Sequence, residues 1–220
     1  GSKCILIDIP YGKSAKFSKK ESLLLKEHFL KMGKIFNLNM EVILTDGSEP
    51  IGNGIGPLWE IKDVLAVLTG NNPPQDLKNK SLFLAGKILE MCDKAKKGTG
   101  EKKARVTLES GLAFKKFTEI IKAQQGNINT INKLKPAFSF PIKATHKQKI
   151  KHFDNKLINQ LARYAGSPED KPAGLYLHKK KGQIIEKNEL LITIYAMSKE
   201  KLQQAMQFFK DNKKNIVEFY

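Results

Sequence analysis

The sequence predicts an α/β chain in which a lobe of sheet and packed helices is followed by a small α+β module. Three observations lead to this prediction. An apolar run at residues 4–10 is typical of a parallel strand, and strand, helix and strand follow one another over residues 4–45. After Pro141, helical periodicity gives way to shorter strand-like pieces. We therefore predict two domains, at residues 3–140 and 141–220.

The first unit begins with the run Cys4–Pro10, whose β-branched residues favour a strand buried on both faces of a parallel sheet. Ser18, with Glu21 three residues later, is a capping-box pattern that predicts a helix reaching about Phe36. A second strand over residues 40–45 completes a β-α-β unit.

A glycine-rich loop, residues 46–57, follows the second strand and holds four glycines and two prolines. Glycines between a strand and a helix N-terminus let backbone N–H groups approach an anion. The spacing matches neither a nucleotide phosphate loop nor a dinucleotide fingerprint. Tight turns with positive φ need the same residues, so both interpretations stay open at this point.

The remaining elements follow from periodicity and turn residues. Asp76 is a predicted helix cap, and Lys181-Gly182-Gln183 is a predicted turn between two alternating strands. In chain order, we expect helices at 58–68, 77–96 and 101–123, a loop at 126–136, strands at 173–178 and 189–196, a helix at 198–212 and a strand at 216–220.

The composition gives a formal net charge of +17, from 39 basic and 22 acidic residues, which suggests a nucleic-acid partner. However, only Arg105 and Arg163 carry the guanidinium group on which base and phosphate recognition depends most. We therefore predict solvated lysine surfaces and no specific nucleic-acid partner. A lysine-rich RNA- or polyanion-binding protein remains the alternative.

Other sequence features bear on membrane association, cellular location and metal binding. No apolar stretch approaches the ~18 residues of a membrane span, so we expect no membrane partner. Cys4 and Cys92 are far apart and lack a metal-binding spacing, which favours two reduced thiols and a cytoplasmic location. The four histidines show no i, i+4 metal pair, so surface or capping roles are expected.

Lys13 and Lys16 are the first candidate binding residues. They come just after the carboxyl end of the first predicted strand, where open α/β sheets bind their ligands. An ammonium group there can hold a phosphate or a carbonyl oxygen. The other interpretation is that both are solvated loop lysines.

Several motifs in register resemble one family. Ile7-Asp8-Ile9-Pro10 with Gly12-Lys13-Ser14-Ala15-Lys16, and the stretch Thr45 to Glu60, resemble motifs of the thymidine and pyrimidine-nucleoside phosphorylases. The resemblance is to the AMP phosphorylase branch in particular. Matching motifs also follow later in the chain: Leu84-Ala85-Gly86, Ser110-Gly111-Leu112-Ala113, Ala123-Gln124-Gln125-Gly126, Leu161-Ala162-Arg163, Ala173 to Lys180, and Tyr195-Ala196.

The resemblance implies phosphorolysis of thymidine, or of a related nucleoside or nucleoside 5′-monophosphate. Inorganic phosphate attacks the anomeric carbon, giving a free base and a (deoxy)ribose 1-phosphate. It also implies that the chain is a C-terminal fragment, with the later part of an α/β lobe and a C-terminal module. Because the family's phosphate cradle and proton donor lie upstream, we expect no catalytic residue here and no turnover by the fragment. A homo-oligomer, a dimer or larger, is expected, and residues 141–220 are a candidate association module.

The same resemblance gives the site residues. Lys16 matches a lysine that the AMP phosphorylase branch uses for its nucleotide. Ile51, Gly54 and Asp63 match positions that hold a monovalent cation such as potassium in some members. Asp63 stands where a glutamate is usual. No other cofactor is expected.

Overall fold

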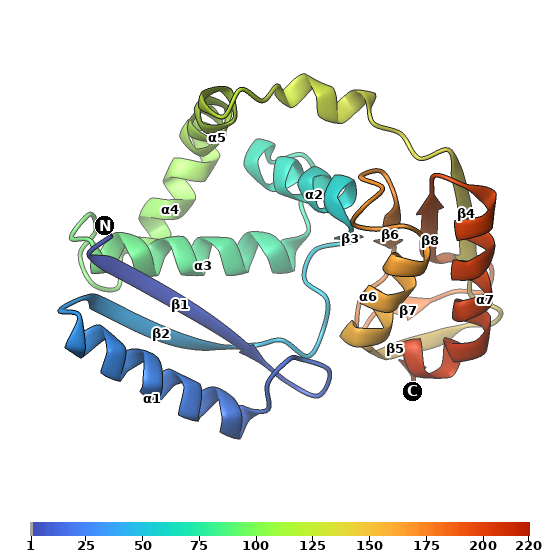
Figure 1. Ribbon diagram of the computed structural model, residues 1–220, viewed down its shortest axis with the longest axis horizontal. Coiled ribbons are helices and arrows are strands. Elements are labelled where there is room, and N and C mark those ends of the chain that lie inside the picture. The colour runs from blue at the N-terminus through green and yellow to red at the C-terminus, as the bar shows by residue number, and fades with distance from the viewer. Residues whose placement is uncertain (1) are drawn as a thin grey trace.

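The computed structural model describes residues 2–220 and has a mixed α/β fold, as predicted. Within these residues there are seven α-helices, one 3-10 helix and nine strands. The strands form a two-stranded sheet (β1-β2), a four-stranded sheet (β3-β6-β8-β4) and a three-stranded sheet (β7-β5-β9) (Figure 1). No helix in the described part of the chain is long and apolar enough to cross a membrane.

The predicted β-α-β unit is confirmed. β1 (Cys4–Tyr11) and β2 (Asn39–Asp46) pair in parallel, joined by α1 (Lys19–Ile35). Ser18 caps α1 with both hydrogen bonds of the capping box. The prediction that the first strand is buried on both faces is wrong, because Ile9 is its only buried residue. In Figure 1, α1 and α3 lie on opposite sides of this sheet. With only two strands, the sheet has no further strand beside β1 that would bury its side chains more fully.

Four helices follow the glycine-rich loop: α2 (Pro57–Thr69), α3 (Gln75–Met91), α4 (Gly100–Glu109) and α5 (Leu112–Ala123). Two predictions are wrong here. Asp76 lies in the first turn of α3, after the cap residue Pro74. The single helix expected at 101–123 is broken at Gly111. Gly111 has a φ of 77°, a left-handed conformation that glycine adopts without steric cost.

The C-terminal part is built around a buried apolar cluster to which Phe153, Leu161 and Ile192 belong, each fully inaccessible. Both strands expected at 173–178 and 189–196 are present, and the last helix runs further than predicted. Two strands and a helix between residues 138 and 164 were not predicted. The elements in order are η1 (Ile128–Lys133), β4 (Phe138–Lys143), β5 (Gln148–Phe153), α6 (Asn155–Tyr164), β6 (Gly174–Leu177), β7 (Ile184–Ile185), β8 (Leu190–Ala196), α7 (Lys199–Ile216) and β9 (Val217–Phe219).

A two-residue strand inside the glycine-rich loop joins the two parts of the chain. β3 (Gly54–Ile55) pairs with β6, Gly54 opposite Tyr176 and Ile55 opposite Leu175. A side chain at Gly54 would overlap the backbone of Trp59, so glycine is required for this close approach. The loop is thus an edge of the four-stranded sheet.

Candidate functional site at the carboxyl ends of the parallel strands

The loops that follow β1 and β2 lie against each other. We call residues 12–18, between β1 and α1, the Lys16 loop. The hydroxyl of Ser14 donates a hydrogen bond to the carbonyl of Ser48 in the glycine-rich loop, at 3.0 Å. The N–H of Gly47 donates to the carbonyl of Tyr11 at 2.8 Å. Because parallel strands end at the same sheet edge, the two predicted candidate segments form one surface.

The structure separates the two candidate lysines of the Lys16 loop. Lys13 forms an ion pair with Glu218 at 2.8 Å, and this hydrogen bond raises the pKa of Lys13. Lys16 is exposed, with its ammonium group 5.5 Å from the centre of the Phe17 ring. No carboxylate of residues 2–220 lies within 4.0 Å of it. Of the two, Lys16 is therefore the ammonium group available to an anionic ligand.

A polar network that the sequence did not reveal lies on the α3 side of the sheet. Lys80 donates to the carboxylate of Asp8 at 2.7 Å and to the hydroxyl of Thr45 at 3.0 Å. Thr45 in turn donates to Asp8 at 2.7 Å. The polar residue Asp8 within an apolar strand was the one sign of it, and its partner on α3 is 72 positions away. The network fixes β1, β2 and α3 together near the candidate site.

The C-terminal part contacts the glycine-rich loop through polar side chains. Glu49 accepts from Nδ1 of His152 at 2.5 Å and from the backbone N–H of Phe153 at 3.1 Å. Asn155 donates its side-chain amide to the carbonyl of Gly47 at 2.7 Å. His152 is only 7% exposed, so the surface or capping role expected for it is wrong.

The three residues predicted to hold a cation line one cavity. Ile51, Gly54 and Asp63 contribute to a cavity of about 340 Å³ between the glycine-rich loop, α2 and α6. Asp63 is 5% exposed, and its Oδ2 accepts the N–H groups of Asn53 at 2.6 Å and Gly54 at 2.7 Å. It has no lysine, arginine or histidine partner among residues 2–220. A buried carboxylate without a counterion is an environment that favours a small cation.

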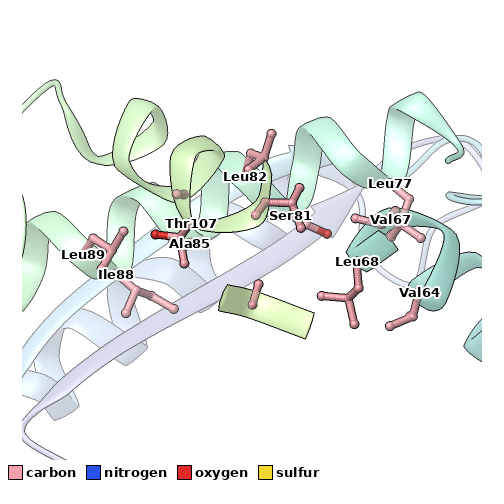
Figure 2. A pocket seen from close by; sticks show the side chains of 13 residues that line it. Val64, Val67, Leu68, Leu77, Ser81, Leu82, Ala85, Ile88, Leu89 and Thr107 are labelled. Atoms are coloured by element: carbon pink, nitrogen blue, oxygen red, sulfur yellow. The ribbon is translucent and has the colours of Figure 1, made fainter. Parts of the chain in front are cut away.

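A second cavity of about 460 Å³ lies among helices α2 to α5 (Figure 2). Its lining is apolar apart from the hydroxyl groups of Ser81 and Thr107. It therefore offers no charged group for a phosphate and no acid or base for proton transfer.

Comparisons with known proteins bear on the same residues. The family model described as the pyrimidine nucleoside phosphorylase C-terminal domain matches residues 149–215. "Putative thymidine phosphorylase" of Legionella pneumophila (strain Corby) is 39% identical over 219 residues, 99% of this chain. The chain belongs to the pyrimidine nucleoside phosphorylase family. This confirms the resemblance inferred from the motifs.

Other members of the family are similar over most of the chain. "Putative thymidine phosphorylase" of Bradyrhizobium diazoefficiens is 45% identical over 199 residues, 89% of this chain and 38% of that protein. "AMP phosphorylase" of Pyrococcus abyssi is 41% identical over 213 residues, 94% of this chain and 42% of that protein. The match to the Legionella protein likewise spans 42% of its length. The chain thus spans about two fifths of the length of these relatives.

Proposed function

We propose that this chain is part of a pentosyltransferase that catalyses phosphorolysis of thymidine, or of a related nucleoside or nucleoside 5′-monophosphate. Inorganic phosphate is the second substrate, and the products are a free base and a (deoxy)ribose 1-phosphate. Residues 3–140 would belong to the α/β domain and residues 141–220 to the C-terminal domain. Family membership, shared with relatives named for thymidine and for AMP, favours this function over polyanion binding.

The observation that carries the proposal is the position of Lys16. Its exposed ammonium group has no carboxylate partner among residues 2–220 and follows the carboxyl end of a parallel strand. A 5′-phosphate or a free phosphate would supply the missing negative charge. Lys13, three residues away, cannot serve equally because Glu218 already holds it.

Phosphorolysis assays test the proposal. The intact phosphorylase is incubated with phosphate and thymidine, uridine or AMP, and the release of base is followed by chromatography. We expect turnover with at least one of them, and a folded enzyme inactive on all would overturn the proposal. The 220-residue chain alone is expected to release no sugar 1-phosphate, because it spans about two fifths of its relatives.

We further propose a monovalent cation, such as potassium, in the cavity of Ile51, Gly54 and Asp63. The support is the buried carboxylate of Asp63, which accepts two backbone N–H groups and has no cationic side chain as a partner within residues 2–220. Backbone carbonyl and carboxylate oxygens are the ligands that hard cations prefer. We also propose that the phosphorylase is a homo-oligomer located in the cytoplasm. Measuring its mass by light scattering tests the oligomeric state.

A further inference from the structure

The ammonium group of Lys180 is bound like a metal cation by the glycine-rich loop. It donates to the carbonyl of Pro50 at 3.0 Å and to the carbonyl of Gly52, and it lies 3.2 Å from Oδ2 of Asp76. The ammonium group thus makes two hydrogen bonds to backbone carbonyls and one ion pair with a carboxylate. Two backbone carbonyls and one carboxylate are also an oxygen set suited to a small hard cation.

Gly52 is held by both its backbone groups. Its carbonyl accepts from Lys180, while its N–H donates to Oδ2 of Asp76 at 3.2 Å. Its φ is 73°, and a side chain there would come within 2.8 Å of Oδ2 of Asp63. The loop thus passes through a left-handed residue whose carbonyl is held by the ammonium group of Lys180 and whose N–H is held by the carboxylate of Asp76.

The backbone of Lys180 is itself held by hydrogen bonds. Its N–H donates to the side-chain carbonyl of Gln183 at 2.7 Å, and its carbonyl accepts from the N–H of Gln183 at 3.1 Å. This turn follows β6, the strand that pairs with β3 of the glycine-rich loop. The side chains of Lys180 and Asp76 are 24% and 41% exposed, so water partly screens the ion pair.

We propose that Lys180 is a positioning residue. Its ammonium group acts as a covalently attached monovalent cation that holds the glycine-rich loop in the conformation described above. The loop in turn supports the Lys16 loop through the hydrogen bond from Ser14 to Ser48. This last step rests on the proposed function, but the clamp at Pro50 and Gly52 does not. The site differs from the proposed potassium cavity, which Lys180 does not line.

Chemical rescue tests the proposal on this chain without substrate. In Lys180→Ala, the melting temperature is expected to fall by about 5 °C, consistent with losing a partly buried charged contact. Methylammonium chloride should recover part of this loss in a saturable way, whereas sodium chloride at equal ionic strength should not. Trp59, the one tryptophan, lies just after the loop, and its indole ring stacks on Tyr195 and donates to the carbonyl of Pro172, so its fluorescence reports how the start of α2 packs on the C-terminal part.

Lys179→Ala is the matched control, because Lys179 pairs with Glu189 outside the loop. Equal effects of methylammonium and sodium on Lys180→Ala, or the same rescue in Lys179→Ala or in the unmodified chain, would overturn the proposal. If Lys180→Ala does not fold, Asp76→Asn weakens the same clamp, and an unchanged melting temperature and Trp59 spectrum would count against it. Rescue without any phosphorolysis by the intact enzyme would refute the proposed function alone.

Discussion

The carboxylate of Glu49 lies 2.5 Å from Nδ1 of His152 and thereby joins the glycine-rich loop to β5 across 103 positions of sequence. Nε2 of His152 is buried and has no hydrogen-bond partner among residues 2–220. Nδ1 must carry a proton to donate to Glu49, whereas a proton on Nε2 would be a buried donor without an acceptor there. Nitrogen NMR of the labelled imidazole is expected to show this Nδ1–H tautomer.

Replacing Glu49 should therefore loosen the loop. In Glu49→Gln we expect the free energy of unfolding to fall by about 1–3 kcal/mol, because a buried donor loses a charged acceptor. Urea unfolding measures it. Glu119→Gln is the control, since Glu119 makes only an exposed pair with Lys116 and should change stability by less than about 0.5 kcal/mol. Equal effects of the two substitutions would contradict the role of Glu49.

Lys16 should distinguish phosphorylated from unphosphorylated substrates. In the intact phosphorylase, Lys16→Met is expected to raise KM for a nucleoside 5′-monophosphate about tenfold, the loss of one charge-assisted hydrogen bond. KM for the matching nucleoside should change much less. Lys13→Met is the control, because Lys13 is already paired with Glu218. If nucleotide and nucleoside are affected alike, Lys16 does not contact the 5′-phosphate.

Asp63 should control both loop stability and the response to potassium. Asp63→Asn removes the negative charge of a carboxylate that accepts two backbone N–H groups. We therefore expect the free energy of unfolding to fall by about 1–3 kcal/mol. In the unmodified chain, potassium chloride should raise the melting temperature above its value in choline chloride at equal ionic strength. Asp63→Asn should abolish that difference. A potassium effect that survives the substitution would place the cation elsewhere.

The chain should lose stability in acid through Glu218. Hydrogen bonds from Lys13 and Lys151 lower the pKa of Glu218, whose side chain is half-buried. A carboxyl group whose pKa is lower in the folded chain stabilises the fold above its unfolded pKa, about 4.3, and loses this effect as the pH falls through the folded value. The midpoint of urea unfolding should fall between pH 5 and pH 3, by less in Glu218→Gln. Identical pH profiles would contradict the prediction.

The thiol of Cys92 should react slowly with alkylating reagents. The neighbouring thiol of Cys4 is the largest cause that raises the pKa of Cys92, followed by burial, so less thiolate is present at a given pH. Alkylation by iodoacetamide, mapped by mass spectrometry from pH 7 to 10, should reach half its maximal rate above the ordinary thiol pKa of about 8.5. In Cys4→Ala the midpoint should move down. An unmoved midpoint would show that Cys4 does not act on Cys92.

The sequence predicted best what local residues determine. Ser18 and Glu21 set the start of α1, and the apolar runs on either side of it set the parallel pair. The break at Gly111 was missed because apolar residues recur at helical spacing on both of its sides. Spacing pointed to Lys13 and Lys16 without choosing between them, whereas the family motifs favoured Lys16 and added Asp63.

What the sequence could not supply are contacts between distant residues. Lys180 reaches Gly52 across 128 positions, and Asp8 reaches Lys80 on a helix that follows the second strand. His152 looked like a surface histidine because its partner Glu49 lies far away in the chain. Such pairs depend on how the elements pack, and no local pattern records them.

The short strand β3 has a consequence for the order in which the chain folds. Its two residues pair with β6, which is made more than 110 positions later. The pairing of Gly54 and Ile55 with β6 therefore cannot form until residues 174–177 are present. The hydrogen bonds from the loop to Tyr11, Asp63 and Asp76 involve residues made much earlier. The glycine-rich loop can thus be held first by the N-terminal part and become an edge of the four-stranded sheet only when the C-terminal part folds.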